Sequence, residues 1–301
     1  MRRATVAELR DRLPVGKVAA DGTRARSFSF KRWRGADERV IGAIREENRS
    51  ISAGAFAAEV LAHFLADWQG ESFEGLSKGE KRLRISQSWA ADVYAAWFEL
   101  RRRALSNEFD SRLHCAQCRT PFDYIVDVGS IDSLELEDGE AISTPFALRD
   151  GLSWQGQDRK LLTLEPLRWE AYEALAPGNE VNLGTVKLAV CASAIVGLEG
   201  IASRVKLPTT ALDDLSKFDL ESLSAWVNEN QPGPVLLIET HCPKCKAPIA
   251  RSFPWVYDVF FSAKTSSTSA PLSGGAGKSS PLPTACPASP SISTGQPPPT
   301  E

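Results

Sequence analysis

The sequence is poor in the residue types that enzymes most often use for catalysis. Its 301 residues include only three histidines, and two of them stand directly before cysteines. We recognise neither a nucleophile elbow nor a metalloprotease helix motif, which would indicate a serine hydrolase or a zinc protease. The acidic clusters at residues 135–138 and 213–214 are typical of solvated loops and helix starts rather than of paired catalytic carboxylates. We therefore predict that the protein is not an enzyme.

The chain also lacks an excess of basic charge and long apolar runs. The formal net charge is −3 and the isoelectric point is about 5.8, so there is no global positive field to hold nucleic acid. No run approaches the roughly eighteen apolar residues of a membrane span, and the N-terminus leads into charged sequence rather than an apolar signal core. We expect a cytosolic protein without a membrane partner, and nucleic acid is not indicated.

Two Cys-x-x-Cys motifs contrast with this scarcity of reactive groups. The first contains Cys115 and Cys118, the second contains Cys242 and Cys245, and residues 119–241 separate them. In a reducing cytosol such pairs are metal ligands or redox groups more often than structural disulfides. Four thiolates complete a tetrahedral zinc site and leave no open coordination position, which is typical of a structural site. We predict about one zinc per chain, held by these four cysteines.

Other interpretations of the two motifs stay open. A thioredoxin-type redox pair would follow a strand and open a helix, whereas both motifs precede predicted strands. The motifs could also carry no metal, or His114 or His241 could replace a cysteine ligand. A zinc hydrolase would require an open coordination position. The long separation weakens the four-cysteine hypothesis, because zinc ribbons usually close much shorter loops.

The pattern of apolar residues predicts a mixed fold. Apolar residues at helical spacing predict helices near residues 40–44, 56–68, 89–104, 166–174, 186–198 and 219–228. Alternating or short apolar runs predict strands at residues 27–30, 122–128, 160–164 and 235–239. A further short helical pattern, Val6, Leu9 and Leu13, ends at Pro14. We predict an α+β fold, predominantly helical, with short antiparallel strands around a zinc-ribbon-like four-cysteine site.

Composition divides the chain into four regions. We predict an N-terminal arm at 1–30, a helical region at 31–110, a zinc-containing α+β region at 111–262 packed with it, and a disordered tail at 263–301. The tail consists mostly of Ser, Thr, Pro and Gly, which cannot bury enough apolar surface to offset the entropy of ordering. Its Gly-rich run at 274–279 lacks the spacing of a phosphate-binding loop.

A Cys-x-x-Cys turn followed by a strand occurs twice in the chain. The sequence between the two copies shows no other alignment. The repetition therefore indicates either a weak internal duplication or two hairpin-like halves of one site.

Several short motifs follow one another in a characteristic order. They are Leu13-Pro14-Val15-Gly16, Arg34-Gly35-Ala36-Asp37-Glu38, Cys115-Ala116-Gln117-Cys118, Val126-Asp127-Val128, Lys206-Leu207-Pro208-Thr209, His241-Cys242-Pro243-Lys244-Cys245 and Phe260-Phe261. Together they resemble the tail baseplate protein family of T-even-type and other contractile-tailed phages, over about residues 10–262. Two features depart from that pattern: the Ser/Pro-rich tail, and Arg34-Gly35 where Thr-Gly is more usual.

The resemblance implies a component or assembly factor of the baseplate hub, encoded by a phage or prophage. Such a protein has no catalytic reaction and no small-molecule substrate, and its partners are other phage tail and baseplate proteins. Its zinc would fix the relative position of two parts of the chain. It would act in the bacterial cytoplasm during assembly, and it could be retained in the virion tail.

The main rival hypothesis is a zinc-ribbon module that binds nucleic acid or is linked to transcription. Such a module would present a basic, aromatic-bearing face near the cysteines, for which Arg119, Arg251 and Trp255 are candidates. Acidic residues such as Asp123 lie in the same predicted strands and weigh against it. The arginine run at 101–103 suits the last turn of a helix, where cations complement the helix dipole.

Overall fold

The computed structural model describes residues 1–47, 51–175 and 183–252. The predicted tail, with its Gly-rich run, lies outside the described residues and stays a prediction. Among the described residues, no helix is both long and apolar enough to cross a bilayer.

Helix and strand contribute nearly equal shares, 35% and 32%. The mixed character and the short antiparallel strands agree with the α+β prediction, but the expected predominance of helix is wrong. The main cause is that two apolar stretches continue from helix into strand without a change of composition. Helix α2 (Ala53–Phe64) passes directly into β4 (Leu65–Trp68), and α6 (Leu183–Ala194) passes directly into β11 (Ile195–Leu198).

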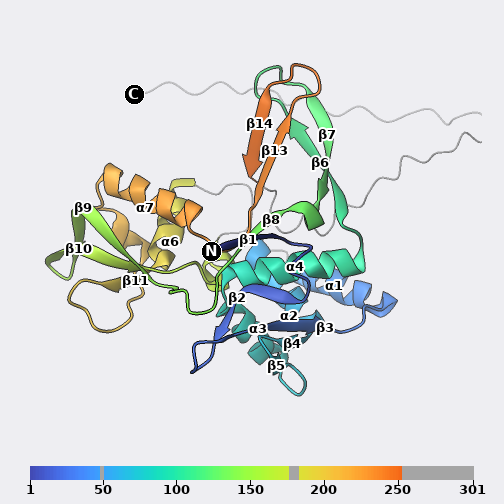
Figure 1. The fold of residues 1–301 in the computed structure, drawn as a ribbon, viewed down its shortest axis with the longest axis horizontal. Helices are drawn as coiled ribbons and strands as arrows, with labels where there is room; N and C mark the ends of the chain where they lie inside the picture. Colours follow the sequence, from blue (N-terminus) through green and yellow to red (C-terminus); the bar gives the residue numbers. More distant parts are fainter. Residues whose placement is uncertain (48–50, 176–182, 253–301) are drawn as a thin grey trace, which may run out of the picture. The chain divides into compact units, whose positions relative to one another are not determined.

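The described elements form two successive halves (Figure 1). In the first half, residues 12–127, the remaining elements are β2 (Arg12–Val18), β3 (Arg24–Phe30), α1 (Gly35–Glu47), β5 (Glu71–Ser72), α3 (Lys78–Ser86), α4 (Ala90–Ala104), β6 (Glu108–His114) and β7 (Pro121–Asp127). In the second half, residues 144–252, they are β9 (Thr144–Trp154), β10 (Gln157–Leu164), α5 (Trp169–Glu173), η2 (Thr209–Leu212), α7 (Lys217–Glu229), β12 (Gly233–Pro234), β13 (Leu237–His241) and β14 (Pro248–Ser252).

Three elements lie outside the two halves: β1 (Arg2–Thr5), η1 (Val128–Ser130) and β8 (Asp132–Glu135). Strand β8 pairs with β1 on one side and with β12 on the other. The helical pattern of Val6, Leu9 and Leu13 does not form a helix. These residues lie in the turn after β1 and at the start of β2, and Leu13 is fully buried. The apolar residues of this buried, irregular turn have the same spacing as those on one face of a helix.

Most predicted helices are confirmed with shifted ends. Helices α1, α2, α4 and α7 occupy the expected stretches, and the arginine run forms the last turn of α4. The helix expected from residue 166 begins only at Trp169. Helix α3 was missed, because it is short and almost entirely polar. Strand β9 was missed as well, because its alternation is weak and a glycine bulge interrupts it.

The two halves repeat the same strand pairing. In the first half β3 pairs with β4 through Phe28↔Trp68, Ser29↔Asp67 and Phe30↔Leu65. In the second half β10 pairs with β11 through Leu162↔Leu198, Thr163↔Gly197 and Leu164↔Ile195. Each ladder leaves one residue unpaired at the same step, Ala66 in the first half and Val196 in the second. The carbonyl of Ala66 accepts the backbone N–H of Phe73, and the carbonyl of Val196 accepts that of Val205. This agreement supports the internal duplication that the sequence left open.

A buried aspartate near the start of one helix in each half strengthens the correspondence. Asp92, the third residue of α4, accepts the backbone N–H groups of Val15 and Gly16 at 2.8 and 3.0 Å. Asp219, the third residue of α7, accepts those of residues 149–151 at 2.8, 2.8 and 3.2 Å. Gly16 and Gly151 both have positive φ, +72° and +101°. Each carboxylate therefore fixes a glycine bulge of the first hairpin strand to a helix.

Each half has its own hydrophobic core. The second-half cluster includes Leu152, Leu164 and Leu223, and it also contains Cys191, which is 1% exposed as expected for a buried small side chain. The first-half cluster is larger and takes in residues of the second half. Among these, Trp169 is completely buried, and its indole Nε1 donates to the carbonyl of Gly54 at 2.9 Å. Helix α5 therefore ties the second half to α2.

We predict that Asp92→Ala and Asp219→Ala destabilise the protein by similar amounts, about 2–4 kcal/mol each. Each change leaves backbone N–H groups without their acceptor. The Asp→Asn variants keep an acceptor oxygen and should lose less. Urea unfolding of the four variants measures this, and a loss confined to one position would contradict the equivalence of the two carboxylates.

Burial raises the pKa of Asp92 to about 6, against the opposing hydrogen bonds from Val15 and Gly16. This pKa lies above the unfolded value of about 3.9, so the stabilisation is complete below about pH 4 and is lost as the pH rises through 6. We predict that the stability of the wild type relative to Asp92→Asn falls by about 2–3 kcal/mol between pH 4 and 7.

Asp219→Asn is the matched control with the opposite sign. Burial raises the pKa of Asp219, but backbone hydrogen bonds from Arg149, Asp150 and Gly151 outweigh it, and the net shift is downward. Stability relative to this variant should therefore be lost as the pH falls. Unfolding curves from pH 3 to 8 decide the matter, and parallel pH profiles for the two variants would refute the assignment.

Candidate metal centre

Each Cys-x-x-Cys motif forms the turn of a β-hairpin. Cys115 and Cys118 lie between β6 and β7, which pair from Glu108↔Asp127 to His114↔Pro121. Cys242 and Cys245 lie between β13 and β14, which pair from Leu237↔Ser252 to His241↔Pro248. The strands expected after the motifs are thus confirmed. Neither motif opens a helix, so the arrangement differs from that of a thioredoxin-type redox pair.

The two turns have the same backbone hydrogen bonds. The N–H of Cys115 donates to the carbonyl of Thr120, and the N–H of Arg119 donates back to the carbonyl of Cys115. The second turn repeats this between Cys242, Ala247 and Lys246. Arg119 and Lys246 both adopt positive φ, 56° and 60°. This conformation reverses the chain tightly enough for both sulfurs of a turn to point in one direction.

The four sulfur atoms converge. All four Sγ atoms lie within 4.8 Å of one another, and this cluster comprises Cys115, Cys118, Cys242 and Cys245. Two separations that run across the hairpins are 3.5 Å, between Cys115 and Cys245, and 3.6 Å, between Cys118 and Cys242. Four thiolates bound at about 2.3 Å around one tetrahedral zinc stand about 3.8 Å apart. The cluster therefore has the dimensions of a four-thiolate metal site.

The arrangement of the sulfurs is symmetric. Exchanging the two turns maps Cys115 onto Cys242 and Cys118 onto Cys245, and it converts one short cross-hairpin pair into the other. The first cysteine of each motif is buried, at 2% and 0% exposure, while the second is more accessible. Each half of the duplication thus contributes an equivalent pair of ligands.

Hydrogen bonds within the turns favour the thiolate form at two positions. Those from the side chain and backbone of Thr120 lower the pKa of Cys118 to about 6. The backbone N–H of Cys245 is the largest cause that lowers the pKa of Cys242. At Cys245 itself the backbone N–H of Ala247 acts in the same direction, but burial and the neighbouring sulfurs prevail and raise the pKa to about 12. A divalent cation would supply the charge needed to ionise all four.

Basic residues adjoin the cysteines in the sequence, and the neighbouring histidines are not among the potential ligands. Arg119, Lys244 and Lys246 are exposed next to the cysteines, where their charge would offset part of the negative charge of four thiolates around a divalent ion. His114 and His241 are also exposed, and neither belongs to the group of potential ligands found among the described residues.

The sulfur cluster joins two hairpins that do not share a sheet. Strands β6 and β7 form one two-stranded sheet, and β13 and β14 form another. Figure 1 shows them side by side with their turns at the same end. An isolated two-stranded hairpin is only marginally stable in water. The long separation of the motifs has a simple cause, because Cys242 follows Cys115 by 127 positions, as Asp219 follows Asp92.

No protein-family model matches the chain, and the searches of curated proteins and of solved structures also found no match. The resemblance to the baseplate family therefore stays a prediction.

One sequence interpretation of a potential catalytic group needs correction. Glu135, expected in a solvated acidic loop, is 3% exposed and forms ion pairs with Arg26 and Arg12, both at 2.8 Å.

The sequence does contain the pattern Gly-x-Ser-x-Gly, centred on Ser77. That serine is the N-cap of α3, and its hydroxyl exchanges hydrogen bonds with Glu80 in a capping box. Four residues separate it from the preceding two-residue strand β5, so it does not stand on the sharp strand-to-helix turn of a nucleophile elbow.

We predict that Cys115→Ser and Cys242→Ser each abolish stoichiometric metal binding and lower the melting temperature, because the turns share one ion and metal binding is coupled to folding. Metal content by mass spectrometry should fall from about one ion per chain to well below one. Cys191→Ser is the matched control, because this buried cysteine lies outside the cluster, and its metal content should be unchanged. Full metal retention in both cluster variants would refute a shared site.

Proposed function

We propose that the protein is a non-enzymatic structural or assembly component in which one zinc ion clasps two duplicated halves. The observation that carries the proposal is the convergence of four cysteine sulfurs, two from each half, within 4.8 Å. Tetrahedral coordination by four sulfurs is typical of zinc. The ion would join hairpins that belong to separate sheets.

The donor set supports a structural rather than a catalytic role. Four protein thiolates fill the coordination sphere of zinc, so no position is left for water or substrate. The buried carboxylates elsewhere in the described residues also have structural partners. Asp92 and Asp219 bind backbone N–H groups, and Glu135 binds arginines. Such groups fix the fold and are not free for proton transfer.

We further propose that the assembly is a phage tail, in which the protein is a baseplate hub component or assembly factor. The support is the ordered set of short motifs that resembles the baseplate family, over about residues 10–262. The partners would be other tail and baseplate proteins, and binding would take place in the bacterial cytoplasm. Protein analysis of purified phage particles would show whether the protein is retained in the finished tail. A rigid clasp suits such a role, because a docking surface built from both halves keeps its shape only while the halves stay in place.

Affinity purification from phage-producing cells tests this proposal. We predict that a tagged wild-type chain co-purifies with tail and baseplate proteins identified by mass spectrometry, and that Cys242→Ser recovers them at a level at least tenfold lower. Cys191→Ser should recover them normally. A wild-type chain that brings down no tail protein would contradict the baseplate assignment, while normal recovery with Cys242→Ser would contradict the role of the clasp.

Titration with duplex and single-stranded DNA discriminates the rival hypothesis. A zinc-ribbon nucleic-acid-binding module would bind in a salt-dependent way and lose affinity when Arg119, Lys244 and Lys246 are replaced by glutamine. We expect no binding above the non-specific level. Salt-dependent binding that requires these three residues would replace the structural proposal with the rival.

A further inference from the structure

A cavity of about 370 Å³ lies where the first half meets the second. Its wall comes from the end of β2, the turn after β4, the link between α3 and α4, the loop that follows β8, and the segment after β10. Sites for small molecules are common at such junctions, and their volumes begin at about 300 Å³. The cavity lies in a different part of the chain from the cysteine turns, so it is independent of the proposed metal site.

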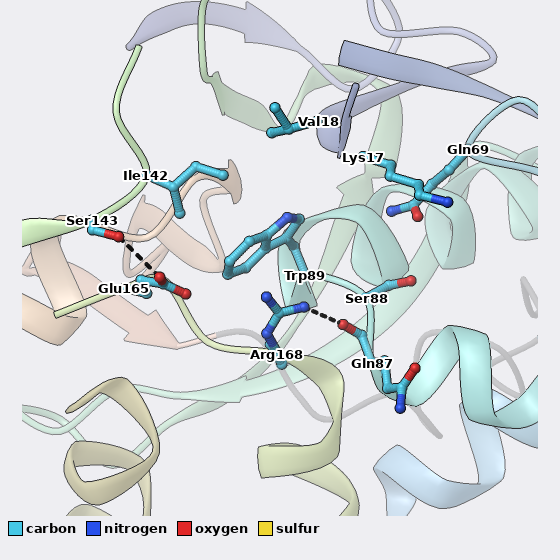
Figure 2. Close-up of a pocket in the computed structure, with 10 residues that line it drawn as sticks. All are labelled: Lys17, Val18, Gln69, Gln87, Ser88, Trp89, Ile142, Ser143, Glu165 and Arg168. Atoms are coloured by element: carbon cyan, nitrogen blue, oxygen red, sulfur yellow. Dashed lines mark hydrogen bonds between the residues drawn. The ribbon is translucent and has the colours of Figure 1, made fainter. Parts of the chain in front are cut away.

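Trp89 forms the apolar centre of this cavity. Figure 2 shows its indole among the lining residues, with Ile142 and Val18 above it and Arg168 below. The guanidinium of Arg168 lies 4.2 Å from the indole centroid. Its Nη1 donates to the carbonyl of Gln87 at 2.6 Å, and the backbones of Trp89 and Arg168 form a β-bridge. The flat ring and the cation are therefore held in place.

The duplication shows that the tryptophan is not needed to start the helix. Trp89 is the N-cap of α4 and makes no side-chain capping hydrogen bond. Ser216, which stands 127 positions later, is the N-cap of α7, and its hydroxyl accepts the N–H of Asp219 at 3.2 Å. A serine at an N-cap typically adds about 1 kcal/mol of stability. At the equivalent position in the first half this capping hydrogen bond is absent, and the side chain is an indole that lines the cavity.

The charge of the cavity is positive. Its single lining carboxylate, Glu165, already accepts hydrogen bonds from Ser143 and, through both oxygens, from Arg204. Two cations remain. Lys17 has only a solvent-exposed ion pair with Glu71, which is worth little in water. Arg168 is partly buried, and this burial lowers its pKa, so its guanidinium would gain from an anion beside it.

Hydrogen bonds fix the backbone of the segments that carry these groups. Asp92 binds the backbone of Gly16, next to Lys17, and also accepts a hydrogen bond from the side chain of Gln69 at 3.2 Å. Arg168 is fixed by the backbone bridge described above. A pre-formed site loses little entropy when it binds a ligand.

We propose that this cavity binds a small organic anion with a flat apolar body. The body lies against Trp89 and Ile142, and the anionic group, a carboxylate or a phosphate, lies beside Arg168, with the exposed Lys17 adding positive charge at the rim. This ligand departs from the sequence-based expectation that the protein takes no small molecule. Its role is binding, and no reaction is implied.

Nuclear magnetic resonance of the full zinc-loaded chain tests the proposal. The Trp89 indole N–H signal, assigned with Trp89→Phe, is followed during titration with benzoate, phenyl phosphate and neutral benzyl alcohol. We expect saturable shifts with at least one of the two anions, and at least tenfold weaker binding of the alcohol. The stronger of the two anions identifies the anionic group. Absence of saturation with both anions, or equal binding of the alcohol, would overturn the proposal.

Variants separate the site from general effects on the fold. Arg168→Gln should weaken binding at least tenfold and Lys17→Gln about threefold, while the exposed control Arg149→Gln, in the second half, should bind like wild type. Val18→Trp fills the cavity without removing a charge, and it should abolish binding at an unchanged melting temperature. If Arg168→Gln fails to fold, the Val18→Trp variant tests the site in its place. Undiminished binding by folded Val18→Trp, or equal weakening by Arg149→Gln, would refute the site.

Discussion

Four sulfur atoms from two turns, separated by residues 119–241, converge within 4.8 Å, and this convergence brings together two hairpins of separate sheets. Each turn alone fixes only two sulfurs, and each hairpin alone is a two-stranded sheet with little independent stability. A shared ion would convert two weak elements into one unit, because metal binding and folding are coupled. Cys115 and Cys242 are buried, so the first sulfur of each turn is shielded from solvent.

The rest of the fold repeats the same construction in both halves. A hairpin with a glycine bulge is fixed by a buried aspartate to the start of a helix, and an apolar helix runs directly into a strand that pairs beside the hairpin. The copies differ where the surroundings differ. Burial outweighs the hydrogen bonds at Asp92 and raises its pKa, whereas the balance is reversed at Asp219. At the helix starts, Ser216 caps α7, while Trp89 faces the cavity at the junction.

Sequence reasoning identified the four cysteines and their metal-binding geometry because a Cys-x-x-Cys turn is a local feature. It also placed α1, α4 and α7, whose apolar spacing is clear. It predicted the wrong secondary structure where a helix passes into a strand within one apolar run, as between Phe64 and Leu65, because the composition does not change there. It left the duplication open as one of two interpretations, although Asp92 and Asp219 have the same spacing as Cys115 and Cys242. Few side chains are identical between the halves, because different residues serve the same packing positions.

The sequence by itself determined the two pairs of potential metal ligands, the absence of a strong basic field and the approximate positions of most helices, since these depend on residue type and on neighbours within a few positions. Only the tertiary structure decided that the two motifs share one site, that Glu135 is buried against Arg26, and that Trp89 and Arg168 line one cavity. These features join residues far apart in the chain. Their formation depends on strand register and core packing, and a local pattern does not encode either one.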